Sequence, residues 1–166
     1  MSKYKICYES ELISHYGSSD VIGYGFVELS DEQAAAIREL VREKGTTDVV
    51  QLRLKEVYPE IYYILDNAYR ELACKTETEY WMWDAYRNGN YCCDIYELLE
   101  YCKENLGFVF EPEEELDVFY NWLDDYVSGL DTEDCKTFFS EQMGIDVSCT
   151  YEADGYRVMI PEEILL

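Results

Sequence analysis

Residues 94–134 constrain this chain more than any other part of its sequence. They hold fourteen acidic residues and one basic residue, Lys103, but leucine, phenylalanine, tryptophan and tyrosine are interleaved with the acids. A disordered acidic tail lacks such apolar side chains. We therefore expect folded amphipathic helices that present rows of carboxylates on a fixed scaffold.

The first of these predicted helices covers Asp94 to Gly107. Its apolar residues recur at helical spacing, with glutamates on the opposite side. Asp94 suits the N-cap position, Glu97 stands where a capping box places an acid, and Gly107 suits the end of a helix.

A second helix is predicted to begin at Pro112 and to end at Gly129, and a third to run from Asp131 to Gln142. The second helix carries a polar row whose members lie about one helical turn (~5.4 Å) apart. This row consists of Glu114, Asp117, Asn121 and Asp124.

The net charge of −23 arises from 36 acidic and 13 basic residues and is unevenly distributed. Residues 1–55 carry a net charge of −2, and residues 56–166 carry −21. The electrostatic field of so large a negative charge repels nucleic acids and anionic lipids. We expect no direct nucleic-acid binding and no membrane binding, and a basic partner is favoured.

The seven cysteines show no metal-binding or redox spacing, and their odd number argues against a disulfide framework. The N-terminus lacks the apolar segment of a signal peptide, and no run approaches the ~20 apolar residues of a membrane span. These observations predict a cytoplasmic protein with free thiols. At 166 residues, of which 48% are hydrophobic, the chain 1–166 is expected to form a single domain.

The N-terminal part predicts a β-hairpin formed by Lys3–Ile13 and Val21–Leu29. Gly23 and Gly25 fall within the second strand. Their spacing is too short for a phosphate-binding loop, and a bulged strand is the better interpretation. Ser30 then caps a helix.

Residues 59–88 have helical spacing, and the pattern leaves open whether they form one helix or two, because Thr76 and Glu79 have capping-box spacing. Trp81 and Trp83 cannot share a helix face. One of them is expected in the core, and the other is a candidate for an aromatic interface.

Near the C-terminus, Ile145–Tyr151 and Tyr156–Ile160 flank Asp154-Gly155, a strong hairpin signal. The predicted fold is therefore α+β. A small antiparallel sheet from the N- and C-terminal β-hairpins packs on a central set of about five acidic amphipathic helices.

The sequence offers no catalytic constellation. Its one histidine, His15, has no serine or cysteine motif near it, and the spacings of zinc sites are absent. The segment from Asp131 lacks the glycine and glutamate of a calcium-binding loop. We therefore predict no catalytic residues, no metal site and no cofactor, and an uncharacterised enzyme is the least favoured alternative.

In size, acidity and absence of catalytic motifs, the chain is similar to the broad class of small acidic inhibitors that phages and mobile elements use against restriction or other defence systems. The similarity is one of composition. It implies a non-enzymatic protein that engages a basic partner, such as a nucleic-acid-binding protein, and its sharpest form is a DNA mimic. The candidate partner-binding residues are Glu97, Glu100, Glu104, Glu114, Asp117, Asp124 and Asp125.

Besides an enzyme, one other alternative remains open at this point. The acidic helix faces could serve solubility alone. In that case the interface, a homo-oligomer included, would be aromatic and would use Trp81 or Trp83.

Overall fold

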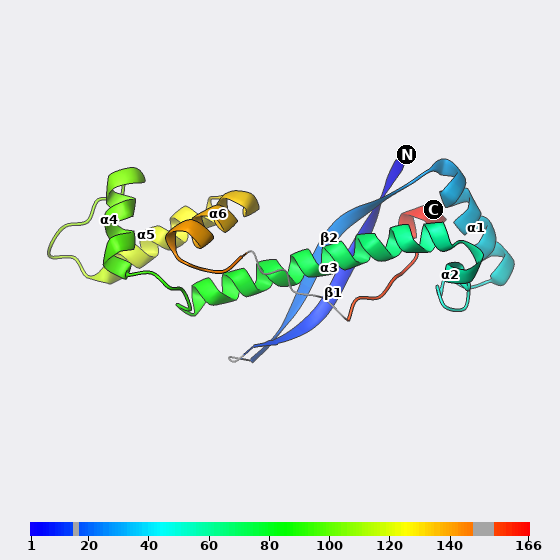
Figure 1. Cartoon of the computed structure of the whole chain (residues 1–166), viewed down its shortest axis with the longest axis horizontal. Coiled ribbons are helices and arrows are strands. Elements are labelled where there is room, and N and C mark those ends of the chain that lie inside the picture. Colours follow the sequence, from blue (N-terminus) through cyan, green and yellow to red (C-terminus); the bar gives the residue numbers. More distant parts are fainter. Residues whose placement is uncertain (15–16, 148–154) are drawn as a thin grey trace. The chain divides into compact units, whose positions relative to one another are not determined.

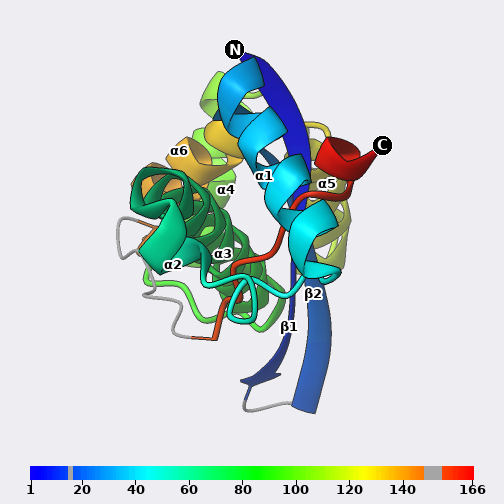
Figure 2. The same cartoon turned by 90° about the vertical axis from the view of Figure 1, so that its right-hand side faces the viewer.

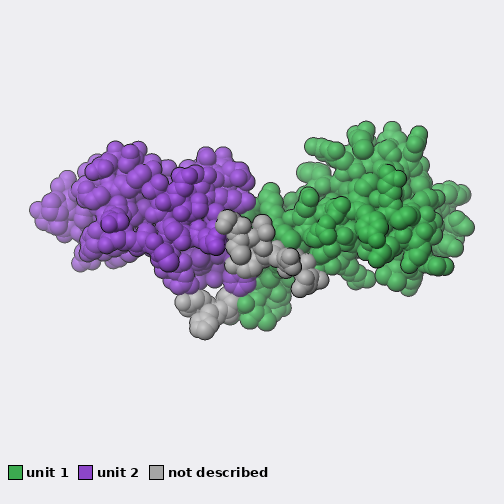
Figure 3. Space-filling model, viewed as in Figure 1, with its two compact units in different colours: residues 1–79, 150–166 green, residues 80–149 purple. Residues whose placement is uncertain are grey.

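The computed structural model describes residues 1–14, 17–147 and 155–166, and it shows an α+β protein (Figure 1). The chain divides into two compact units, Met1–Glu79 with Thr150–Leu166 (unit 1) and Tyr80–Cys149 (unit 2), which are coloured separately in Figure 3. That residues 1–166 behave as one domain stays a prediction. The elements in chain order are β1 (Ser2–Ser14), β2 (Gly17–Leu29), α1 (Asp31–Lys44), α2 (Leu54–Val57), α3 (Pro59–Arg87), α4 (Ile95–Asn105), α5 (Leu116–Ser128), α6 (Thr132–Gln142) and the 3-10 helix η1 (Glu162–Leu165).

The predicted N-terminal hairpin forms, but its second strand begins at Gly17 and not at Val21. Strands β1 and β2 pair antiparallel in one continuous register, from Ser2 opposite Leu29 to Ser14 opposite Gly17. Alternation places one face of this hairpin in the core of unit 1, where Ile6 and Val27 are buried. Because the register contains no extra residue, the predicted bulge at the β2 glycines is wrong.

The β2 glycines instead allow close packing against α3. A Cβ atom on Gly23 would lie 1.9 Å from Oγ1 and 3.0 Å from Cβ of Thr76, and one on Gly25 would lie 3.3 Å from Leu72. Tyr8, opposite Gly23 in the register, donates a hydrogen bond from its hydroxyl to Glu77 at 3.1 Å. The hairpin therefore approaches α3 at a distance that a side chain at position 23 would prevent.

Helix α1 begins at the predicted cap. The Ser30 hydroxyl accepts a hydrogen bond from the Gln33 amide at 3.1 Å, and the Gln33 side chain accepts one from the Ser30 amide at 2.9 Å. Gly45 ends the helix with a φ of 68°, in the left-handed region. Arg38 donates from its guanidinium to the carbonyl of Ile164 at 3.1 Å, and η1 lies beside α1 (Figure 2).

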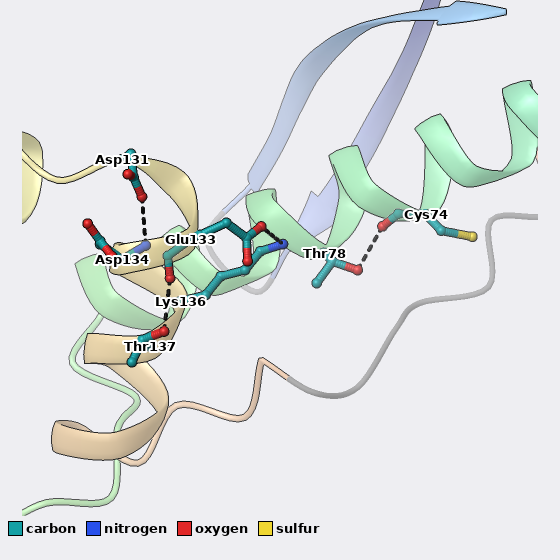
Figure 4. Close-up of polar contacts among 7 residues, drawn as sticks. All are labelled: Cys74, Thr78, Asp131, Glu133, Asp134, Lys136 and Thr137. Carbon is teal, nitrogen blue, oxygen red and sulfur yellow. Dashed lines mark hydrogen bonds and ion pairs between the residues drawn. The ribbon is translucent and has the colours of Figure 1, made fainter. Parts of the chain in front are cut away.

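Residues 59–87 form one helix, α3, which settles the question that the sequence left open. The expected second cap does not form, because the Thr76 hydroxyl donates to the Leu72 carbonyl at 2.7 Å within the same helix. Thr78 donates in the same way to the Cys74 carbonyl at 2.7 Å (Figure 4). Threonine hydroxyls that bond back to position i−4 are compatible with an uninterrupted helix.

Each unit has its own apolar core. In unit 1 the core includes buried residues of the hairpin, α1 and α3, with Ile37, Leu65 and Leu72 among them. In unit 2 it includes Met82 from the last part of α3, the apolar faces of α4, α5 and α6, and Phe108, Met143 and Ile145 from the connecting segments.

The acidic helices of unit 2 match the sequence pattern except at one start. Asp94 caps α4 by accepting the Tyr96 amide at 2.8 Å, and Asp131 caps α6 by accepting the Asp134 amide at 2.8 Å. Helix α5, however, begins at Leu116, and the start predicted at Pro112 is wrong. Residues 112–114 form a turn instead, in which the Glu111 amide donates to the Glu114 carboxylate at 3.1 Å.

The predicted C-terminal hairpin is not seen in the described residues. Residues 156–160 have no strand partner, and the described sheet contains β1 and β2 alone. Their burial still alternates, with Ile160 in the core and Arg157 exposed, so the pattern reflects packing of an extended segment on unit 1. Asp154 and residues 148–151 of the predicted first strand lie outside the described residues.

We predict that Gly23→Ala lowers the free energy of unfolding by about 1–3 kcal/mol, the usual cost of overpacking. The added methyl group would collide with Thr76, whose own Cβ is too close for a rotamer change to relieve the contact. Urea denaturation followed by circular dichroism measures the change. Gly25→Ala is the matched control on the same strand and face and should cost less, since Leu72 can move; equal stability of Gly23→Ala and the wild type would contradict the prediction.

Candidate functional site

The acidic helices of unit 2 pack around an aromatic core. Trp122 stacks on Tyr126 with ring centroids 5.3 Å apart, and Phe108 lies 4.9 Å from Trp122. Helix α6 joins this core through Phe139, whose ring centroid is 5.2 Å from that of Trp83. Interlocked rings of this kind fix the helices that carry the acids.

Unit 2 contains seventeen acidic and three basic residues, so its formal net charge is −14. Two of the basic residues are engaged within their own helices. Lys103 lies 3.5 Å from Glu100 on α4, and Lys136 lies 3.6 Å from Glu133 on α6 (Figure 4). The third, Arg87, lies over the ring of Trp83, with 5.8 Å between its guanidinium carbon and the ring centroid. Little positive charge is therefore available to neutralise the carboxylates.

All seven acids predicted to bind a partner are exposed. On α4 they are three residues at i, i+3 and i+7, which share one helix face. The Glu114–Asp124 row is shorter than predicted, because Glu114 lies in the turn before α5. The four acids for which the described part of the chain provides no ion pair or side-chain hydrogen bond are Glu97, Glu104, Asp117 and Asp125.

Asp124 lies at a hollow of about 380 Å³ in the surface of unit 2, which the sequence did not reveal. Its carboxylate accepts a hydrogen bond from the Tyr86 hydroxyl. Burial, followed by this hydrogen bond to a carboxylate, raises the pKa of Tyr86 far above its ordinary value. Tyr91, Tyr120 and Arg87 also line the hollow, which thus combines one carboxylate and one guanidinium with three aromatic rings.

The two tryptophans proposed for an aromatic interface are both partly buried. Trp83 packs on Phe139 and belongs to the periphery of the unit 2 core. Trp81 makes an edge contact with Tyr80, with ring centroids 4.9 Å apart. Neither ring lies among the strongly exposed apolar side chains of the described residues, and their role in an interface stays a prediction.

Unit 1 has a larger groove, of about 780 Å³, that the sequence analysis missed. Within it, Asp66 accepts a hydrogen bond from the Tyr156 hydroxyl at 2.9 Å and lies 3.9 Å from Arg70. Asp48 accepts the backbone amide of Val50 at 2.9 Å and lies 3.6 Å from Arg157. Each carboxylate is thus matched by an arginine, and the contacts of Tyr156 with Asp66 and of Arg157 with Asp48 hold the C-terminal segment to the rest of unit 1. The Tyr156–Asp66 contact joins residues 90 positions apart, and the Arg157–Asp48 contact joins residues even farther apart, so no pattern of local spacing could have predicted them.

Two searches of the described residues gave negative results. No group of three or more histidine, cysteine and acidic side chains there is placed to hold a metal ion. No helix in that part of the chain has the length and apolar character needed to cross a membrane. The six described cysteines are all free thiols.

Comparison of the chain with protein-family models, with curated proteins and with solved structures finds no match. The site is therefore interpreted from its own geometry and charge.

We predict that Tyr86→Phe flattens the alkaline limb of the stability curve. The pKa of Tyr86 is raised in the folded protein, so as the pH rises the unfolded chain loses the phenolic proton first. The contribution of Tyr86 to the free energy of unfolding is therefore complete below the unfolded pKa of about 10 and falls above it. The free energy of unfolding, measured by urea titration between about pH 9 and pH 11, should fall less steeply in the variant than in the wild type.

Asp124→Asn serves as the companion variant. It keeps the Tyr86 ring buried but removes the charged acceptor, so its alkaline slope should lie between those of the wild type and Tyr86→Phe. Identical slopes for all three proteins would show that Tyr86 does not titrate as described.

Proposed function

We propose that the chain is a non-enzymatic protein-binding domain whose acidic helices engage a basic surface on a partner protein. The observation that carries this proposal is the presence of exposed carboxylates on helices held by an aromatic core, four of them without an ion pair or a side-chain hydrogen bond in the described residues. A surface that existed for solubility alone would gain nothing from such rigid presentation. A basic partner gains, because preformed charge lowers the cost of ordering on binding.

In its sharpest form the proposal is mimicry of a nucleic acid. Asp117 and Asp124 are seven residues apart on α5, which places them on one face about two helical turns (~10.5 Å) from each other. The acids on α4 form a second row with similar spacing. Basic nucleic-acid-binding sites are built to meet repeated negative charges, and a partner of this kind is the natural target.

The hollow at Asp124 supports an anchor within this surface. Arg87 lines the same hollow, but its guanidinium lies over the Trp83 ring and forms no ion pair with Asp124 in the described residues. The Asp124 carboxylate beside the rings of Tyr91 and Tyr120 can therefore provide an ionic partner and aromatic surface for one cationic side chain. Arginine fits best, since its planar guanidinium both stacks on rings and pairs with carboxylates. Arginine is also enriched among residues that dominate binding energy at interfaces.

The proposal includes a cellular location. Seven cysteines without metal or redox spacing, six of them free thiols in the described residues, support a reducing compartment such as the cytoplasm. The net charge of −23 supports repulsion of nucleic acids and of anionic membranes, so the partner is sought among proteins.

We predict that simultaneous reversal of Glu114, Asp117 and Asp124 to lysine abolishes capture of the basic partner in a pull-down from cell lysate, without unfolding the domain. The matched control reverses Glu56, Glu60 and Glu71, three exposed acids of unit 1, and so changes the net charge equally. If both triple variants lost the partner alike, net charge and not the unit 2 surface would be responsible; retention by the first variant would exclude this surface.

We also predict that the captured complex dissociates as salt is raised from about 50 to 500 mM, because exposed charges are screened over a few ångströms at high ionic strength. Duplex DNA should compete with the chain for the partner if the surface imitates a nucleic acid. A salt-resistant complex that is lost on Trp81→Ala or Trp83→Ala would instead establish the aromatic interface. A salt-sensitive complex that DNA fails to displace would exclude mimicry but keep the acidic interface.

A further inference from the structure

The outward face of the N-terminal hairpin bears an apolar row with no covering element described. Three consecutive outward residues of β2 are strongly exposed, with Ile22 at 52%, Tyr24 at 63% and Phe26 at 64%. Their partners in the register on β1 are Glu9, Cys7 and Lys5 respectively. A sheet face that exposes three large apolar side chains side by side is typical of an interaction surface.

The charges on the β1 half of this face follow a symmetric order. From the beginning of the strand outward-facing positions read basic, basic, neutral, acidic, acidic. The residues in this order are Lys3, Lys5, Cys7, Glu9 and Glu11. A two-fold rotation centred on Cys7 therefore brings every base opposite an acid, which is the self-complementarity that a symmetric dimer interface requires.

The hairpin is also the place where two copies of so acidic a chain can approach. Residues 2–29 carry two basic and four acidic residues, a net charge of −2, against −14 for unit 2. Contact between copies through unit 2 would be opposed by like charges, whereas contact through the hairpin is nearly free of that cost.

We propose that a second copy of the chain packs face to face on the outward face of this hairpin, about a two-fold axis at the Cys7–Tyr24 pair. The strands of the two copies run in opposite directions, so that Lys5 faces Glu9 of the second copy and Lys3 faces its Glu11. On β2, Tyr24 meets its own counterpart and Phe26 packs on Ile22. Sheets packed in this way interdigitate their facing side chains about 10 Å apart.

Two features of the face fit this arrangement. The Lys5 ammonium lies over the Tyr24 ring, 4.7 Å from its centroid, which holds the charge toward the outward side. The one unfavourable match, Glu28 opposite Asp20 of the second copy, is eased because Lys3 lies 3.8 Å from Glu28 within the same hairpin. Aromatic side chains at the centre with charges at the rim are the usual composition of an interface.

Sedimentation velocity over a range of concentrations tests the proposal with a charge swap. The wild type should form dimers with a dissociation constant below about 100 µM. Lys5→Glu and Glu9→Lys should each raise the dimer dissociation constant by about tenfold or more, because each places like charges opposite one another at two symmetric positions. The double variant Lys5→Glu with Glu9→Lys restores opposite charges and should recover most of the wild-type affinity.

The matched control is Lys55→Glu with Glu56→Lys. Lys55 is likewise a cation over a tyrosine ring, 5.7 Å from the centroid of Tyr62, but lies on α2, away from the hairpin face. This control should dimerise as the wild type does. Tyr24→Ser with Phe26→Ser should give monomers whose circular dichroism spectrum is unchanged, since both side chains are exposed.

A wild type that stays monomeric at 100 µM (roughly −5.5 kcal/mol of binding free energy) would overturn the proposal. So would a dimer that survives the serine double variant, or a charge swap that fails to restore what either single reversal removes. Loss of the folded spectrum in the serine variant would leave the charge swap as the deciding measurement.

Discussion

Burial along helix α3 is the interaction on which both compact units depend. Its first part supplies Leu65, Tyr69 and Leu72 to the core of unit 1, and its last part supplies Met82 to the core of unit 2. Fully burying a side chain of this size stabilises the fold by roughly 1.5–3 kcal/mol. Most of the stability of a helix in a protein comes from packing of its apolar face, so these contacts and the 29-residue helix stabilise each other.

The acids are compatible with this fold because they stay hydrated. Carboxylates on the outward faces of α4, α5 and α6 keep their water, and their mutual repulsion is spread over exposed positions where salt screens it. The ion pairs Lys103–Glu100 and Lys136–Glu133 lie on the surface and contribute little. Stability in unit 2 therefore comes from its aromatic core, which leaves the carboxylates available for binding.

Local chemistry made much of the fold predictable. The hairpin pattern and the caps at Ser30 and Asp94 are each encoded within a few residues, and each forms as expected. The helix predicted from Asp131 begins one residue later, at Thr132, with Asp131 as its cap. Helical period also separated the apolar from the polar faces of α4 and α5, and the six proposed acids on these two helices are exposed. Glu114 is exposed as well, but in the turn before α5.

The predictions that were wrong are those in which a local sequence pattern competed with other contacts in the folded chain. Thr76 and Glu79 have the spacing of a cap, but the Thr76 hydroxyl bonds back to Leu72 and the helix continues. Residues 156–160 alternate like a strand, but they lie against unit 1 without a strand partner in the described residues. The Tyr156–Asp66 contact and the hollow at Asp124 join distant segments, so neither could be read from spacing along the chain.

The distribution of charge assigns the two proposed surfaces to different parts of the chain. We expect the acids of unit 2 to attract a basic partner and to repel a second copy of the chain, which the hairpin would repel far less. The two contacts do not compete for the same residues. A two-fold dimer would carry two acidic surfaces. A partner with two basic sites that match the geometry of the dimer would then bind with higher avidity, without any new type of contact. An extended basic partner, such as a protein that grips a long nucleic acid, is the kind of target for which such doubling has the largest effect.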